Sequence, residues 1–352
     1  MERKQKDILL CIQCGVGILG FGLFSLPTAA VYFGSNFFWG YIALAAAIAL
    51  AGVLLFCTVF EETVYETCKA VVPRHSTWIS ILYAFLYTAV TAFLFSYYAH
   101  TVQNWFLDGV PRFLIALFLA AVSLYTAAKP AQDSARLIGF VGVFVLLTVV
   151  VMRFVMLFSG DVRNLMPMFE MENAMQLPGG VLFLSGFFVL VGLLGIFRMP
   201  RKRKRRSGAA AVVFAAFLFI LAAAGCISVL GPVQTAQYLD STVLAMKNLN
   251  LSKMDFLQRG DLVFIVTWSF LILCTSTLSC QIPYRTVCAV FPHVKRGWLY
   301  GSFFLLYVLC AAVVPSEELA LVLLVYTSVG TGAVILIILP VVLLLVKRRK
   351  KR

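Results

Sequence analysis

The sequence predicts an all-α polytopic membrane protein with ten transmembrane helices, arranged as a 5+5 inverted repeat in which helices 1 and 6 are interrupted. Three observations favour this fold. The 352-residue chain is 62% hydrophobic and 12% charged, whereas soluble domains carry about 25% charged residues. Its apolar windows are long enough to span a bilayer, which takes about 20 residues. Basic residues alternate between the two sides of these windows, as the positive-inside rule requires.

The ten predicted spans form a single transmembrane domain over residues 1–352. They cover residues 8–31, 38–60, 77–99, 111–127, 136–158, 179–197, 209–230, 261–282, 298–314 and 319–346. Five spans in each half give a first repeat at 1–158 and a second at 179–346. Because the number per half is odd, the second half enters the membrane with opposite polarity, which is what an inverted repeat needs.

Charge sets the predicted orientation. If the N-terminus is cytoplasmic, most of the 29 lysines and arginines lie on the inner side, including R-K-R-K-R-R at 201–206 and K-R-R-K-K-R at the end of the chain. We therefore expect both termini in the cytoplasm. These basic runs are expected to contact anionic membrane lipid rather than nucleic acid. Arg153, near the outer end of the fifth span, is expected to snorkel to the interface.

The first span contains the stretch C-G-V-G-I-L-G-F-G-L-F-S-L-P at 14–27, with four glycines at 15, 17, 20 and 22. An interior glycine costs a helix about 1 kcal/mol relative to alanine, so this density favours a helix that opens. In the bilayer core an opened backbone survives only where protein or a water-filled cavity satisfies its polar groups. The alternative is close helix packing through small residues.

The sixth span, from Gly180, is also interrupted by glycines, at 186, 192 and 195. Interrupted segments at corresponding positions of two halves predict a substrate site near the bilayer midplane. On the third span, Ser80, Tyr83, Tyr87 and Thr91 fall on one helix face. Such hydroxyls bind a ligand or satisfy neighbouring backbone groups. The candidate ligand-binding residues are Gly15, Gly17, Gly20, Tyr83, Tyr87, Ser185, Gly186 and Gly192.

Two segments outside the spans also have predicted structure. The longest outer loop, at about 231–260, contains a predicted helix at Ser241–Asn248 with Ser241 in the capping position, which would serve as a lid or a partner surface. On the inner side, Glu61, Glu62 and Glu66 are expected to extend the second span as an interfacial helix with solvated charges. The first apolar run is too long for a cleavable signal peptide and has no small-residue exit.

The sequence gives little support to an enzyme. Its three histidines, at 75, 100 and 293, have no carboxylate or cysteine at catalytic or metal-ligand spacing. The nine cysteines show neither a disulfide framework nor a zinc motif, and there is no P-loop. We expect no catalytic residue, no metal and no cofactor. Apart from Asp261, which opens the eighth span at the outer interface, the predicted spans contain no aspartate or glutamate. This favours ligand binding or passive conduction over ion-coupled transport.

Several motifs resemble one known family. An N-terminal K-x-K-D-I-L-L leads to G-I-L-G-F-G-L-F-S-L-P, and these are followed by A-A-V-Y-F-G-S-N-F-F-W-G-Y at 29–41 and F-L-Q-R-G-D-L-V-F-I-V-T-W-S-F at 256–270. Together they resemble the endospore germination permeases, the B subunits of spore germinant receptors. The similarity covers nearly the whole chain. Gln258 and Gly260 depart from the family's E-R-[FL]-[DE] motif, whereas Arg259 and Asp261 match it.

The resemblance implies a LeuT-like fold of the amino acid-polyamine-organocation superfamily, in the inner membrane of the spore. It also implies binding of a small germinant such as an amino acid, with A- and C-type receptor subunits as partners. We expect the germinant's carboxylate on freed N–H groups near Gly15 to Gly20, and its side chain against Tyr83, Tyr87 and the 185–192 segment. Two alternatives stay open: a secondary amino-acid transporter, and a non-binding structural subunit.

Overall fold

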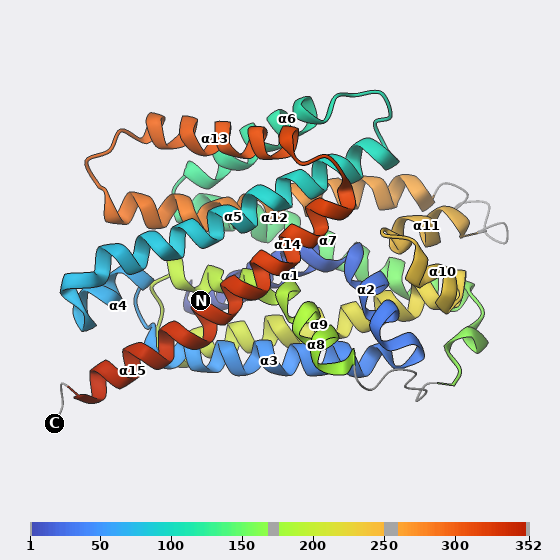
Figure 1. The fold of residues 1–352 in the computed structure, drawn as a ribbon, viewed down its shortest axis with the longest axis horizontal. Coiled ribbons are helices and arrows are strands. Elements are labelled where there is room, and N and C mark those ends of the chain that lie inside the picture. Colours follow the sequence, from blue (N-terminus) through green and yellow to red (C-terminus); the bar gives the residue numbers. More distant parts are fainter. Residues whose placement is uncertain (1, 168–175, 250–259, 350–352) are drawn as a thin grey trace.

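The computed structural model describes residues 2–167, 176–249 and 260–349, and in these parts of the chain every regular element is a helix (Figure 1). Residues 256–259 of the family-like motif at 256–270 lie outside them. The longer helices are α1 (Glu2–Gly22), α2 (Ser25–Gly34), α3 (Phe38–Val59), α4 (Val64–Val71), α5 (Ser76–Trp105), α6 (Arg112–Ala128), α7 (Ala131–Ser159), α8 (Leu177–Ser185), α9 (Arg201–Leu230), α11 (Ser241–Asn248), α12 (Gly260–Val290), α13 (Arg296–Val313), α14 (Glu317–Gly332) and α15 (Leu339–Arg349).

The predicted helical membrane architecture is confirmed. By length and composition, eight helical stretches of the described chain are able to cross a membrane. Two further apolar helices, Asp7–Gly22 and Arg112–Ala128, are shorter than 18 residues. They correspond to the first and fourth predicted spans, so the count of ten and the division into two five-helix repeats stay predictions.

The first span is interrupted, although not at its glycines. Gly15, Gly17 and Gly20 lie inside the continuous helix α1, and the chain turns at residues 23–24 before α2 begins. Proline has no N–H to bond the carbonyl four residues earlier, so Pro27 leaves the Leu23 carbonyl without its helical partner. That carbonyl accepts a hydrogen bond from Thr242 Oγ1 at 3.0 Å instead. The expected opening at residues 15–20 was therefore wrong, because Pro27 sets the break.

The sixth span is interrupted by a change of helix type. It begins as α8 and continues as the 3-10 helix η5 (Gly186–Ile196), whose 11 residues far exceed the usual three or four. All residues of η5 from Gly186 to Gly195 are buried. It contacts α1, α12 and α14, so this unusual segment lies in the centre of the helical bundle.

At one end of the bundle, which we call the α4 end, charged residues tie α3, α4 and α9 together. Arg198 pairs with Glu62 and, at 3.5 Å, with Glu66, while Arg201 pairs with Glu61 at 3.2 Å. The expectation that Glu61, Glu62 and Glu66 extend the second span as one helix was wrong, although their side chains are solvent-exposed as expected. Helix α3 ends at Val59, and α4 starts separately with a capping box between Thr63 and Glu66.

Lys204 belongs to the basic run that was expected to contact lipid, yet it is fully buried. Its ammonium group donates to the carbonyl oxygens of Phe60 at 3.0 Å, Glu61 at 3.2 Å and Glu62 at 3.1 Å. The last carbonyls of a helix have no intrahelical donor. Phe60 is the C-cap residue of α3, and Glu61 and Glu62 follow it. Lys204 therefore caps α3 at Phe60 and also binds the two residues after the helix, with three donors for three carbonyls.

We expect Lys204→Met to lower the free energy of unfolding, because it leaves the carbonyls of Phe60 and Glu62 without this donor, and an unsatisfied buried group costs about 1–3 kcal/mol. The Glu61 carbonyl keeps a second donor, the backbone N–H of Met199 at 3.3 Å. Chemical unfolding of the detergent-purified chain measures this effect. Lys202→Met is the matched control, since Lys202 is exposed on the same turn of α9. Equal stability of the two variants would contradict the capping role.

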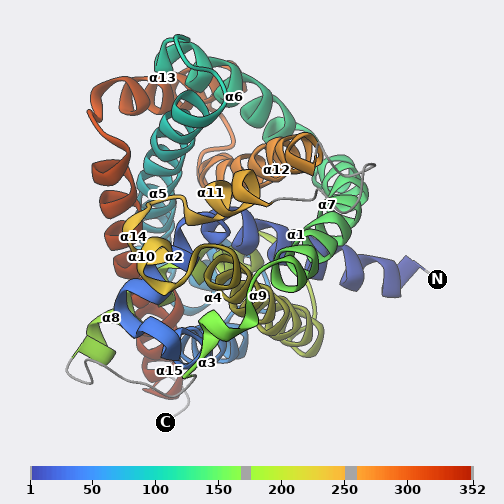
Figure 2. The same cartoon turned by 90° about the vertical axis from the view of Figure 1, so that its right-hand side faces the viewer.

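The opposite end, which we call the α11 end, is covered by α10 (Pro232–Gln237) and α11, which lie across the bundle in front of α2 (Figure 2). Helix α11 has the predicted bounds. Its N-cap residue is Asp240 rather than Ser241, one residue earlier than expected. Thr28 Oγ1 on α2 donates toward the Tyr238 carbonyl at 2.8 Å. This hydrogen bond connects α2, which follows the break in the first span, to the segment between α10 and α11.

Candidate functional site

Two tyrosines of α5 connect the third span to the interrupted sixth span. Tyr83 Oη donates to the Gly192 carbonyl at 2.7 Å, and Tyr87 Oη donates to the Val189 carbonyl at 2.9 Å. Both side chains are fully buried. Hydrogen bonds within a 3-10 helix have poor geometry, so its carbonyls benefit from side-chain donors. We call this arrangement the tyrosine junction, made by Tyr83 and Tyr87 on α5 with Val189 and Gly192 on η5.

Glycine is required on the η5 side of the junction. A Cβ atom at Gly192 would lie 1.6 Å from Tyr87 Oη, and one at Gly195 would lie 2.6 Å from Tyr83 Oη. Each hydroxyl therefore reaches the η5 backbone only because a side chain is absent there. Of the predicted site residues, the structure brings together Tyr83, Tyr87 and Gly192.

The predicted glycines of α1 differ in their surroundings. A Cβ at Gly20 would lie 1.8 Å from Thr275 Oγ1 on α12, so Gly20 permits close packing of the two helices. Its carbonyl also accepts a hydrogen bond from Tyr98 Oη at 2.5 Å. At Gly17 a Cβ would be 3.7 Å from Leu190 of η5, and at Gly15 it would be 4.0 Å from Phe214, which are ordinary contacts. The small-residue packing alternative thus holds at Gly20.

Ser185 and Gly186 lie beside α14. Ser185 Oγ donates to the Leu182 carbonyl at 2.7 Å and lines a cavity of about 50 Å³ together with Ser328 of α14. A Cβ at Gly186 would lie 2.9 Å from Val329 of α14. Val189 of the tyrosine junction lines the same cavity, so Ser185 lies beside the junction, but its hydroxyl bonds to Leu182 and not to the junction residues. Because side chains fill the space beside Gly20 and Gly192, the junction is closed in this structure.

A buried carboxyl group at the α11 end was missed by the sequence analysis. Asp240 is 1% exposed, and its Oδ1 and Oδ2 accept hydrogen bonds from Tyr97 Oη at 2.7 Å and Trp105 Nε1 at 2.9 Å. Thr101, between these two donors, donates to Glu317 Oε1 at 2.5 Å. Residues 97, 101 and 105 share one face of α5. A row of hydrogen-bond donors at this spacing could have predicted a buried acceptor beside α5.

Burial, together with the nearby charge of Glu317, raises the pKa of Asp240 well above its usual range. The folded state therefore binds the proton more tightly than the unfolded chain, whose aspartates have a pKa of about 3.9. It follows that this contribution to stability is complete below about pH 4 and is lost as pH rises through the raised pKa of Asp240.

We expect Asp240→Asn to remove this loss, because asparagine does not ionise. The midpoint of thermal unfolding, measured from about pH 4 to 8, should then depend less on pH in the variant than in the wild type. Asp108→Asn, on the exposed loop between α5 and α6, serves as the control for the removal of a carboxylate that is not buried. An identical pH profile for wild type and Asp240→Asn would contradict the assignment.

Residues 8–320 match the model of a family described as spore germination protein. The chain belongs to the spore germination protein family. Among curated proteins it is similar to spore germination protein B2 of Bacillus subtilis (strain 168), with 22% identity over 281 residues, which cover 76% of this chain and 74% of the relative. The resemblance to the germination permeases is therefore confirmed.

Among solved structures, the chain is similar to a nucleobase-cation-symport-1 family transporter in a closed conformation with bromovinylhydantoin bound. The TM-score is 0.56 at 14% identity, and the match covers 86% of this chain and 70% of the transporter. At this identity the likeness shows the fold, and it confirms the transporter-like, LeuT-like architecture. Family and fold together are those of an integral multi-pass membrane protein of the permease or receptor type.

Proposed function

We propose that this chain is the B subunit of a spore germinant receptor and binds a small germinant, an amino acid in the first instance, at the tyrosine junction. The observation that carries the proposal is the hydrogen bonding of Tyr83 and Tyr87 to an interrupted span that also packs against the broken first span. The family match and the likeness to a germination protein named B2 support it. We place the protein in the inner spore membrane with both termini cytoplasmic.

The break in the first span supplies a place for the germinant's carboxylate. Helix α2 starts at Ser25, directly after the break, and its N-cap residue makes no side-chain capping hydrogen bond. Free N–H groups at a helix start attract anions. This replaces the continuous stretch Gly15–Gly20 as the carboxylate contact in our proposal. Gly17 lies on the side of α1 that faces η5, since a Cβ built there would be 3.7 Å from Leu190.

Germinant binding requires the closed junction to open. The hydroxyl groups of Tyr83 and Tyr87 would leave the η5 carbonyls and face the ligand. A ligand shifts such an equilibrium only by its differential affinity for the two states. The A- and C-type subunits would respond to a change in the conformation of η5 and of the helices around it. One of these helices is α14, which contacts η5 and begins at Glu317, next to Asp240.

A second candidate is a secondary amino-acid transporter, which the fold shared with a transporter favours. Proteoliposomes that contain only this chain separate the possibilities. A carrier gives counterflow of labelled amino acid, whereas the receptor gives saturable binding without flux. A structural subunit gives neither result, and counterflow at carrier rates would contradict the receptor proposal.

A further inference from the structure

Arg153 on α7 lies inside the protein rather than at the membrane interface. Its side chain is 2% exposed, contrary to the snorkelling expected from the sequence. Nη1 donates to Met156 Sδ at 3.1 Å, and Nε has no hydrogen-bond partner. No ion pair to Arg153 is found in the described chain. A guanidinium group has five N–H donors, and a thioether is a weak acceptor, so most of its hydrogen-bonding capacity is unused.

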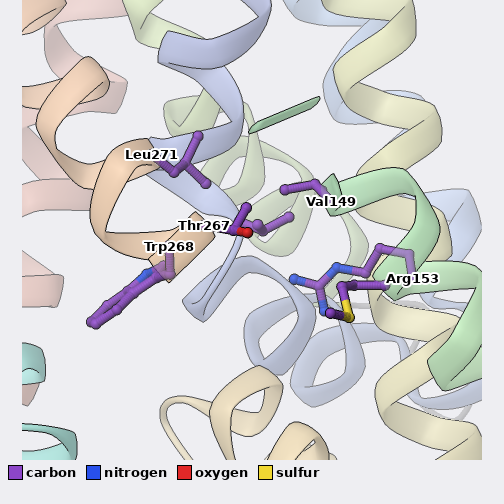
Figure 3. A pocket seen from close by; sticks show the side chains of 7 residues that line it. Val149, Arg153, Thr267, Trp268 and Leu271 are labelled. Atoms are coloured by element: carbon purple, nitrogen blue, oxygen red, sulfur yellow. The ribbon is translucent and has the colours of Figure 1, made fainter. Parts of the chain in front are cut away.

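The Arg153 side chain lines a small, almost wholly apolar cavity beside the break in the first span. Figure 3 shows it extending from α7 toward Thr267 of α12. Leu23, the first residue of the break, also lines this cavity, and the rest of the wall is mainly apolar. The cavity measures about 10 Å³, which is close to the smallest volume that holds one water-sized species.

The nearby polar groups are already engaged. Thr267 Oγ1 donates to the Val263 carbonyl at 2.8 Å, and the Leu23 carbonyl accepts from Thr242. Arginine stays protonated in proteins, and a buried charge without a partner is strongly unfavourable. A singly charged anion in the cavity would remove that penalty, because charge-assisted hydrogen bonds are the strongest kind.

We propose that the Arg153 cavity binds one small monovalent anion and so links α7 and α12 at the break in the first span. The anion is either chloride from solution or the carboxylate group of an amino acid. The carboxylate source rests on the proposed function, whereas the chloride source does not depend on it. The size of the cavity excludes large anions such as gluconate.

The test uses the full chain, purified in detergent with sodium gluconate as the only salt. Its melting temperature is titrated with sodium chloride and, separately, with sodium formate, the smallest carboxylate, at constant ionic strength. We expect a saturable rise in the wild type that is lost in Arg153→Met, since methionine fills the volume without charge. Arg163→Met, which removes an exposed charge, should keep the rise.

Each outcome decides the proposal. A saturable rise with chloride that is lost in Arg153→Met supports an ion from solution, and a rise with formate alone supports a carboxylate ligand. If chloride, formate and gluconate act alike, or if Arg153→Met keeps the rise, the cavity holds only water and the proposal is wrong. Should Arg153→Met not fold, Arg153→Lys decides, because an unchanged midpoint of the titration would also overturn the proposal. No amino acid enters the chloride titration, so its failure is distinct from a failure of germinant binding.

Discussion

Gly20→Ala is expected to destabilise the protein, whereas Gly17→Ala on the same helix is expected to be neutral or stabilising. The new Cβ at residue 20 would lie 1.8 Å from Thr275 Oγ1 and 2.8 Å from Thr275 Cβ, so α1 and α12 must separate. Overpacking of this kind costs about 1–3 kcal/mol. At residue 17 the nearest atoms are 3.6 Å away, and alanine gains up to about 1 kcal/mol of helix propensity.

Unfolding of the detergent-purified variants measures this difference. A third variant, Gly20→Ala with Thr275→Ala, removes the closest contact and should recover part of the lost stability. If Gly17→Ala and Gly20→Ala were equally stable, then close packing between α1 and α12 would not be the reason for glycine at residue 20. The comparison thus separates packing from helix opening as the role of these glycines.

The double variant Tyr83→Phe/Tyr87→Phe is expected to loosen η5. It leaves the buried carbonyls of Gly192 and Val189 without their hydroxyl donors, and each loss costs about 1–3 kcal/mol. The aromatic rings remain, so the packing volume is nearly conserved. We expect faster amide hydrogen exchange through residues 186–196 than in the wild type, measured by mass spectrometry of the purified protein.

Tyr326→Phe is the control for this variant, because Tyr326 lies on α14, is 67% exposed, and also touches the α8–η5 region through Phe183. Its exchange in η5 should match the wild type. Unchanged exchange in the double variant would show that the two hydroxyl groups do not hold η5, and the tyrosine junction would then lose its proposed role as the element that opens.

The existence of the interrupted spans followed from local sequence, but the place of the first break did not. A high density of glycines favours an opened helix, and this directed the prediction to residues 15–20. Helix α1 stays continuous there because α12 packs directly on Gly20. The break is set instead by Pro27, which has no N–H to donate to the Leu23 carbonyl. Thr242, which is far away in the sequence, donates to that carbonyl in its place.

Charged residues were the least predictable part of the site. Hydropathy windows show whether a charged residue lies inside or outside a predicted span. They do not show which groups the residue contacts in the folded chain. Lys204 was grouped with a lipid-facing run yet caps α3, and Asp240 was counted as a loop residue yet is buried against α5. By contrast, the tyrosine stripe could be predicted, because helical spacing alone puts Tyr83 and Tyr87 on one face.

The most direct test of the central proposal is a thermal-shift screen of the purified chain against the common amino acids, with Gly192→Ala and Gly179→Ala in parallel. A Cβ at Gly192 enters the tyrosine junction, whereas Gly179 has no neighbouring atom within 4 Å of its ideal Cβ. At 100 times its dissociation constant a ligand adds about 2.7 kcal/mol of stability. The account predicts a stereospecific, saturable shift that Gly179→Ala keeps and Gly192→Ala loses. A shift that survives in Gly192→Ala, or the absence of a shift with every amino acid, would contradict it.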